Sequence, residues 1–131
     1  MKITSRFMSG QRFASDIRGH TVITDVTREM GGTDAGPMPP ELVATALGTC
    51  VGIYAVAFCQ KHGIAAEGMV VHTEWEKVPN PDRIGRMRVC VEVPAGIPEH
   101  KHAAFMRTVQ ECMVHNTLCQ MPQVTLCLGG A

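Results

Sequence analysis

The longest apolar stretch of the sequence runs over residues 42–59 and reads LVATALGTCVGIYAVAFC. It contains no charged residue and no proline, and it lies between Pro39-Pro40-Glu41 and Gly63. Proline suits the first turn of a helix and glycine suits the end, so these signals predict a helix over about residues 40–62. The run is near the shortest length that spans a membrane, but threonines and glycines dilute it and the rest of the chain is mixed and charged. The pattern therefore favours a helix that is buried on nearly every face of a soluble protein.

Shorter β-rich segments lie on both sides of this run. Three predicted strands precede it, separated by Gly10 and by Arg18-Gly19-His20, and a loop rich in glycine and proline leads from them to the helix. A predicted hairpin follows the helix, with its turn at Pro79-Asn80-Pro81-Asp82. The predicted ranges are 2–7, 12–17 and 21–26 for the first strands, 28–40 for the loop, and 68–78 and 86–93 for the hairpin.

The C-terminal third shows a second helical pattern over residues 99–120 and a last short strand over residues 124–128. Strands and helices grouped in this order predict an α+β domain in which helices pack on one face of mainly antiparallel sheets. At 131 residues the chain is expected to form a single domain, residues 1–131. A fully apolar long helix is difficult for so small a domain to cover alone, and we therefore expect a homodimer.

The charges are balanced, with 12 Lys and Arg against 12 Asp and Glu. This argues against nucleic acid or an anionic membrane surface as the main partner, because both attract a basic footprint. Residues 1–6 lack the apolar segment of a secretory signal, so we expect a cytoplasmic protein. In that compartment the six cysteines are kept reduced, and their scattered spacing is no disulfide framework.

Helical geometry distinguishes the thiols. Cys50 lies at the centre of the apolar run, and Cys59 falls on the opposite side of the same helix, because nine residues turn it through about 900°. The cysteines of the predicted strands face away from the apolar stripes, and Cys119 lies where the second helix ends. Cys112 is thus the best-placed partner for Cys50. The plain alternative is that each cysteine is a small buried hydrophobe without chemistry.

Two segments resemble the motifs of the OsmC/Ohr family. The first is PELVATALGTC at residues 40–50, preceded by GGTDAGP at 31–37, and the second is CMVHNTL at residues 112–118. The resemblance implies an OsmC-like fold over essentially the whole chain, as an intertwined homodimer with active sites at the subunit interface. It also implies a thiol-dependent peroxidase that reduces organic hydroperoxides without a cofactor. Cys50 would then be the peroxidatic cysteine and Cys112 the resolving one, recharged by a dithiol such as a lipoylated protein.

The sequence departs from that family at three places. The family holds its thiolate with an arginine fixed by a glutamate ten residues before the cysteine, where this chain has Pro40. Glu41 stands nine residues before Cys50, on the opposite side of the helix, and is expected to cap the helix N-terminus instead. The candidates for the arginine that would stabilise the Cys50 thiolate are Arg12 and Arg28. The alternative is that each is an ordinary surface arginine. Met113 replaces a proline after the second cysteine, so the second helix either runs on or breaks for tertiary reasons.

These departures keep other interpretations open. One is an OsmC-like dimer that binds a small hydrophobic ligand without peroxidase turnover, and another is a structural dimer with inert thiols. His115 lies three residues after Cys112 on nearly the same helix face. We expect it to act there as a base toward the thiol or as a pH-dependent switch. No metal site is expected, because the paired spacings of zinc ligands are missing and His100-x-His102 is a weak signal.

Overall fold

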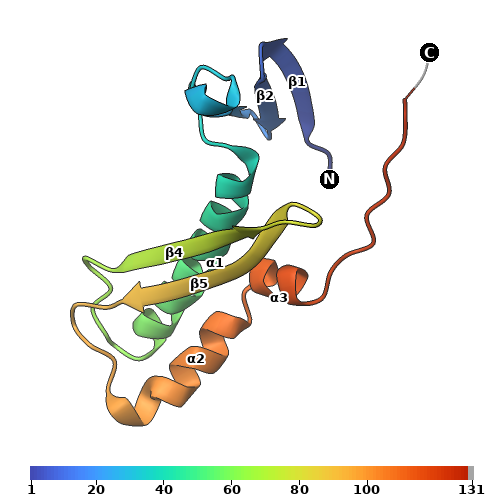
Figure 1. The fold of residues 1–131 in the computed structure, drawn as a ribbon. Coiled ribbons are helices and arrows are strands. Elements are labelled where there is room, and N and C mark those ends of the chain that lie inside the picture. The colour runs from blue at the N-terminus through green and yellow to red at the C-terminus, as the bar shows by residue number, and fades with distance from the viewer. Residues whose placement is uncertain (130–131) are drawn as a thin grey trace.

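The N-terminal part of the chain forms a three-stranded antiparallel sheet. The structure is a computed structural model that describes residues 1–129 (Figure 1). Strands β1 (Thr4–Ser9), β2 (Arg12–Ile17) and β3 (His20–Thr24) follow one another in the sheet in chain order. A short 3-10 turn, η1 (Arg28–Met30), lies in the loop that connects the sheet to the first helix. The predicted strands and loop are thus present, and the sheet lies beyond the N-terminal end of that helix.

The apolar run forms helix α1 (Pro39–Lys61), within one residue of the predicted bounds. Two prolines occupy its first positions, where their missing N–H groups cost no hydrogen bond. The carboxylate of Glu41 accepts a hydrogen bond from the backbone N–H of Met38 at 2.8 Å, which confirms the predicted capping role. Gly63, with φ 66°, follows the helix in a left-handed conformation that glycine adopts readily.

The hairpin that follows α1 packs along it. Strand β4 (Val70–Val78) pairs with β5 (Arg83–Glu92) in antiparallel register, with one irregularity at Glu76 and Lys77. Strand β5 begins three residues earlier than predicted. Its alternating Met87, Val89 and Val91 pack against the core, as the period-two pattern predicts.

The second helix is not continuous. It divides into the 3-10 turn η2 (Glu99–Lys101), helix α2 (His102–Gln110) and helix α3 (Met113–Cys119). At Cys112 the backbone leaves the helical region, with φ −51° and ψ 127°, although no proline enforces the break. The reason is tertiary, because the bend buries Cys112 completely in the core beside α1. The sequence left open whether the helix over residues 99–120 is continuous or broken. The structure shows that it is broken into three segments.

The core gathers side chains from α1 and α2 under the hairpin. Phe58 of α1 and Phe105 of α2 meet edge to face, with ring centroids 5.3 Å apart. The buried cluster consists of Leu47, Val51, Ala55, Phe58, Phe105, Val109 and Cys112.

The expectation that α1 is buried on nearly every face is wrong for the single chain. Only 39% of its apolar window is buried, and Ile53 is 68% exposed. By length and composition α1 is also able to cross a membrane, a property that core helices of soluble proteins share. The difference arises because the sheet, α2 and α3 cover one side of the helix and leave the other open.

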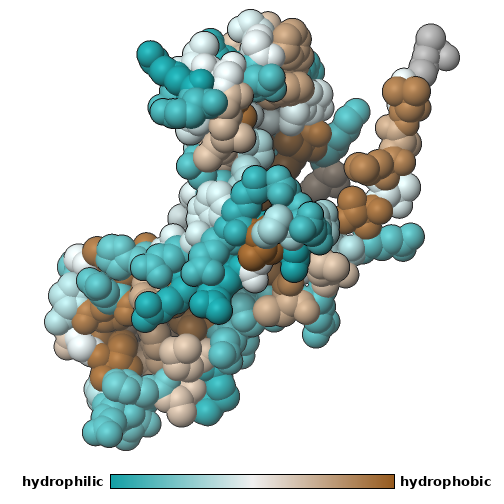
Figure 2. Space-filling model, in the orientation of Figure 1, coloured by the Kyte–Doolittle hydropathy of each residue, from teal (hydrophilic) through white to brown (hydrophobic). Residues whose placement is uncertain are grey.

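The predicted last strand over residues 124–128 is also absent from the described chain. A strand needs the N–H and C=O groups of a neighbour, and this segment lies apart from both sheets (Figure 1). Its alternating Val124, Leu126 and Leu128 are exposed, and Figure 2 shows the hydrophobic side chains of this segment standing away from the rest of the molecule.

Candidate thiol site

The thiols of Cys50 and Cys112 are neighbours at the core of the molecule. Cys50, in the middle of α1, is half-buried and packs against the core, and Cys112 is fully buried at the start of α3. Burial raises the pKa of the Cys112 thiol, and the neighbouring Cys50 thiol raises it further. The backbone N–H of His115, which donates to the Cys112 sulfur at 3.4 Å, acts in the opposite direction. Cys112 is therefore held as a neutral thiol beside Cys50.

This arrangement suits the reversible formation of a disulfide between Cys50 and Cys112. Two neighbouring thiols from separate helices can approach to form a bond of about 2.05 Å. The sequence singled out both residues, and the structure brings them together from two separate helices. Cys59, on the opposite side of α1, is fully buried, and burial raises the pKa of its thiol, so it remains protonated and apart from the pair.

A buried carboxylate, Asp25, organises the loop in front of α1. It accepts hydrogen bonds from the Thr33 hydroxyl at 2.7 Å and from the N–H groups of Val26 at 2.8 Å and Ala35 at 3.1 Å. These bonds, the Thr33 hydroxyl first, hold the pKa of Asp25 far below its usual range. Sequence reasoning missed Asp25. The available signal was an aspartate at a strand end before a glycine-rich loop, where free N–H groups need an acceptor.

Arg12 is held by the same loop. Its Nη2 donates to the Thr33 hydroxyl at 2.8 Å, and its Nε lies 4.0 Å from the Asp25 carboxylate. Within residues 1–129, that Nε is a buried nitrogen without a hydrogen-bond partner. Arg28 lies exposed in η1. In the described part of the chain, neither arginine is hydrogen-bonded or ion-paired with a thiol of the pair, because the N-terminal sheet lies beyond the end of α1 (Figure 1).

His115 lies next to two cysteines. Besides the N–H bond to Cys112, its ring Nδ1 is 3.1 Å from the carbonyl oxygen of Gln110, and its Nε2 is 3.5 Å from the sulfur of Cys119. The structure thus joins His115 to Cys112 through its backbone N–H, whereas the spacing predicted a side-chain contact, and the ring lies against Gln110 and Cys119 instead. Within the described chain, no cluster of three or more His, Cys, Asp or Glu residues is arranged to hold a metal ion.

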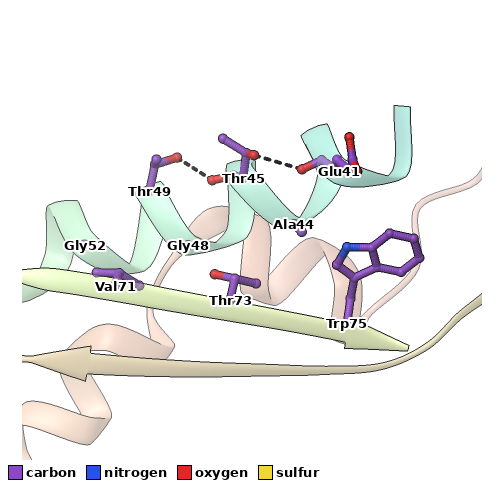
Figure 3. A pocket seen from close by; sticks show the side chains of 9 residues that line it. All are labelled: Glu41, Ala44, Thr45, Gly48, Thr49, Gly52, Val71, Thr73 and Trp75. Atoms are coloured by element: carbon purple, nitrogen blue, oxygen red, sulfur yellow. Dashed lines mark hydrogen bonds between the residues drawn. The ribbon is translucent and has the colours of Figure 1, made fainter. Parts of the chain in front are cut away.

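A further cavity lies on another face of α1. This groove of about 530 Å³ runs between the first half of α1 and β4, with Trp75 beneath the start of the helix (Figure 3). Thr45 and Thr49 border it, and their hydroxyls donate to helix carbonyls at 2.8 and 2.7 Å, which leaves their oxygens free only as acceptors. Gly48 lines the groove about 200° around the helix from Cys50. The thiol pair therefore does not open into this groove.

Residues 32–126 match the family described as OsmC-like protein, which is most of the sequence. The chain belongs to the OsmC-like family. No curated protein matches the sequence. The family membership accounts for the two cysteine motifs, both of which fall within the matched residues.

Solved structures confirm the OsmC-like fold. A protein of Psychrobacter arcticus 273-4, described as an osmotic stress induced and detoxification response protein, superposes with a TM-score of 0.81 at 16% identity over 89% of this chain and 87% of its own. An OsmC like protein of Mycoplasma pneumoniae gives 0.77 at 17% identity over 92% and 87%. An organic hydroperoxide resistance protein OsmC of Legionella pneumophila gives 0.65 at 15% identity over 92% and 90%. At these identities the likeness establishes the fold.

Within the OsmC-like fold, this chain retains both motif cysteines and differs around them. Pro40 lies in the first turn of α1 and offers no carboxylate, and Glu41 is occupied with the cap. The carboxylate nearest to Arg12 is instead that of Asp25, which comes from the end of β3. Met113 begins α3 where a proline is usual, and Cys112 nevertheless takes the N-cap position.

Proposed function

We propose that this protein is a thiol-dependent peroxidase that reduces organic hydroperoxides in the cytoplasm. The observation that carries the proposal is that the half-buried Cys50 packs against the core cluster that contains the buried Cys112, which brings the two thiols close together. Family membership supports it, because a solved relative from Legionella pneumophila is named an organic hydroperoxide resistance protein. In this proposal Cys50 is the peroxidatic cysteine and Cys112 the resolving one.

The first step is attack of the Cys50 thiolate on one oxygen of the hydroperoxide. The O–O bond breaks, an S–O bond forms, and the leaving alkoxide takes a proton, so that the products are a sulfenic acid and an alcohol. Cys50 suits this role because it is the more accessible of the two thiols. The apolar residues around it suit a hydrophobic hydroperoxide.

The second step is condensation of Cys112 with the sulfenic acid. The Cys112 sulfur forms a bond to the Cys50 sulfur, the S–O bond breaks, and water leaves with the Cys112 proton. The raised pKa of Cys112 fits this order, because a protonated Cys112 supplies a hydrogen bond to Cys50 during the first step and a proton in the second. An external dithiol, such as the lipoyl group of a protein, then reduces the disulfide and is oxidised to its cyclic disulfide.

A second copy of the chain completes the site in this proposal. The open side of α1 carries Ile53, which is 68% exposed, and the C-terminal segment exposes Leu126 and Leu128. Burying apolar area of this kind is worth about 25 cal/mol per Å². We expect a homodimer by light scattering, and we expect Ile53→Lys to weaken it while Gln60→Lys, an exposed polar position of the same helix, leaves it intact. A stable wild-type monomer would contradict this part of the proposal.

A hydrophobic-ligand-binding dimer without turnover is the second candidate. Two observations favour it: Pro40 stands in place of the family glutamate, and Arg12 is engaged with Thr33 and Asp25. A thiol in apolar surroundings stays protonated unless a cation favours its ionised form. In this interpretation the thiols are retained as small core residues, and the protein binds hydroperoxides no better than the corresponding alcohols.

Thiol counting after peroxide treatment separates the two candidates. The reduced protein is mixed with one equivalent of cumene hydroperoxide, and free thiols are counted and any disulfide is mapped by mass spectrometry. The peroxidase predicts rapid loss of two thiols, mapped to Cys50–Cys112, which is abolished in Cys50→Ser and preserved in the matched control Cys127→Ser. Thiols that survive for minutes in the folded wild type would leave the ligand-binding function as the better account.

A further inference from the structure

We propose that Cys119 and His115 form a second thiol site, separate from the Cys50–Cys112 pair, that exchanges with small apolar disulfides carrying a negative charge. The proposal goes beyond the peroxidase function and does not depend on it. It rests on two observations: the orientation of the His115 ring between a carbonyl and a thiol, and an apolar cavity with one cation that opens at this thiol.

The surroundings of His115 fix which ring nitrogen carries the proton. The Gln110 carbonyl oxygen, 3.1 Å from Nδ1, only accepts hydrogen bonds, so Nδ1 is the N–H donor. In the neutral ring Nε2 then presents its lone pair, and the Cys119 thiol, 3.5 Å away, is its donor. His115 is thereby oriented as a base toward an exposed sulfur.

The turn of α3 supports this orientation. Cys119 follows His115 by four residues, which places the two side chains on one face of the helix. The backbone N–H of His115 is bound to the Cys112 sulfur, which holds the beginning of the helix against the core. The ring therefore projects from a fixed backbone, and the thiol that it contacts is at the surface rather than inside.

A cavity of about 400 Å³ lies beside the two side chains. Hydrophobic residues of α1, β5 and the chain after α3 form most of its wall, and the cavity is large enough for a small aromatic ligand. Arg86 is the charged residue of the lining that is cationic at neutral pH, and its nearest acidic partner, Glu76, is 4.0 Å away across the exposed face of the hairpin. The lining residues used here are Val43, Leu47, Met87, Leu118, Met121 and Arg86.

The ligand class follows from these groups. An apolar wall favours an aromatic or branched body, and the guanidinium favours a carboxylate on it. The carbonyl end of α3 opposes a negative sulfur at Cys119, whereas Arg86 and a protonated His115 favour one. In the exchange, Cys119 gives its proton to His115, its sulfur bonds to one sulfur of the disulfide, and the other sulfur leaves as a thiol after taking a proton.

Site-resolved reaction rates test the proposal with the reduced, full-length protein. Dithiobis-nitrobenzoate, an aromatic disulfide with carboxylates, is added in pulses, and the labelled cysteines are counted by mass spectrometry. Cys127 is the internal reference, because it is also exposed and lies in the same chain. We expect Cys119 to react at least about tenfold faster than Cys127, at the low end of what a positioned base contributes.

Matched variants separate the base from the cation. His115→Gln is expected to reduce the Cys119 rate to that of Cys127, whereas His100→Gln, an exposed histidine in η2, leaves it unchanged. Arg86→Gln is expected to slow the anionic disulfide but not the neutral dithiodipyridine, and Arg83→Gln serves as its control. Each Cys119 rate is expressed as a ratio to the Cys127 rate in the same sample, so differences in reagent concentration cancel, and circular dichroism checks that each variant is folded. Equal rates for Cys119 and Cys127 in the wild type, or a His115→Gln variant that retains the difference, would overturn the proposal.

Discussion

Oxidation of the thiol pair is expected to stabilise the protein by an amount that the structure allows us to estimate. Cys50 packs against the cluster that contains Cys112, so we expect a disulfide between them to require little rearrangement of α1 or α3. It would close a loop of roughly 60 residues in the unfolded chain, which corresponds to about 4 kcal/mol of lost conformational freedom in the unfolded state.

The measurable consequence is a higher melting temperature. For a domain of this size each kcal/mol corresponds to about 3–5 °C, so the cross-linked protein should melt about 10–20 °C above the reduced protein. The assay is thermal denaturation followed by circular dichroism, without reductant, after one equivalent of cumene hydroperoxide. Protein concentration is held constant, because subunit association also shifts the melting temperature.

The controls isolate the bond itself. Cys112→Ser treated in the same way should show no increase, and incubation of the oxidised wild type with dihydrolipoamide should return the original melting temperature. A protein that is cross-linked between Cys50 and Cys112 but melts no higher than the reduced form would refute the reasoning. That result would mean that the bond strains α1 against α3, and that the contact between the thiols is not a preformed disulfide geometry.

Three further predictions concern groups around the site. The pKa of Asp25 is lowered in the folded state, so its ionised form contributes stability at pH values above its ordinary pKa of 3.8, and this stability is lost as the pH falls below that value. On acidification, the urea midpoint of the wild type should therefore fall more steeply than that of Asp25→Asn. Parallel curves for the two proteins would contradict this. Cys59 should react with iodoacetamide only through unfolding, at a rate that tracks global stability across urea concentrations, because burial shields it and raises its pKa. Gly32→Ala should cost about 1–3 kcal/mol in chemical denaturation, since its Cβ would overlap the Val26 carbonyl and the Asp25 carboxylate, whereas Gly129→Ala, which meets no neighbour, should cost nothing.

The elements that the sequence predicted well are those whose signals are local. Helix α1 was delimited by Pro39, Pro40 and Gly63, which act on the backbone where they stand. The valine stripe of β5 was recognised by its period of two, and the hairpin by its turn residues. The capping role of Glu41 followed from its distance to Cys50 along a regular helix, and the hydrogen bond to Met38 confirms it.

The features that escaped prediction depend on residues distant in the sequence. The break at Cys112 has no proline to announce it and exists because the bend packs Cys112 against α1. The burial of Asp25 depends on the path of the loop through Thr33 and Ala35. The glycine and proline content of that loop predicts only that it is irregular, and not which path it takes. Likewise, the bond from the His115 N–H to the Cys112 sulfur requires α3 to begin one residue after Cys112, because in a continuous helix that N–H would donate to the carbonyl oxygen of Glu111.

The sequence of α1 is apolar, yet one side of the helix is exposed, and this mismatch has a physical explanation. A helix that exposes Ile53 to water forgoes the stabilisation of about 1.5–3 kcal/mol that full burial of such a side chain brings. The alternating Val124, Leu126 and Leu128 present a strand pattern without a neighbour to pair with, on the same chain. Both patterns are satisfied together if a second copy supplies an apolar surface for α1 and a strand edge for the C-terminal segment. The positions at which the sequence pattern and the single chain disagree are therefore the positions where we infer that the partner subunit binds.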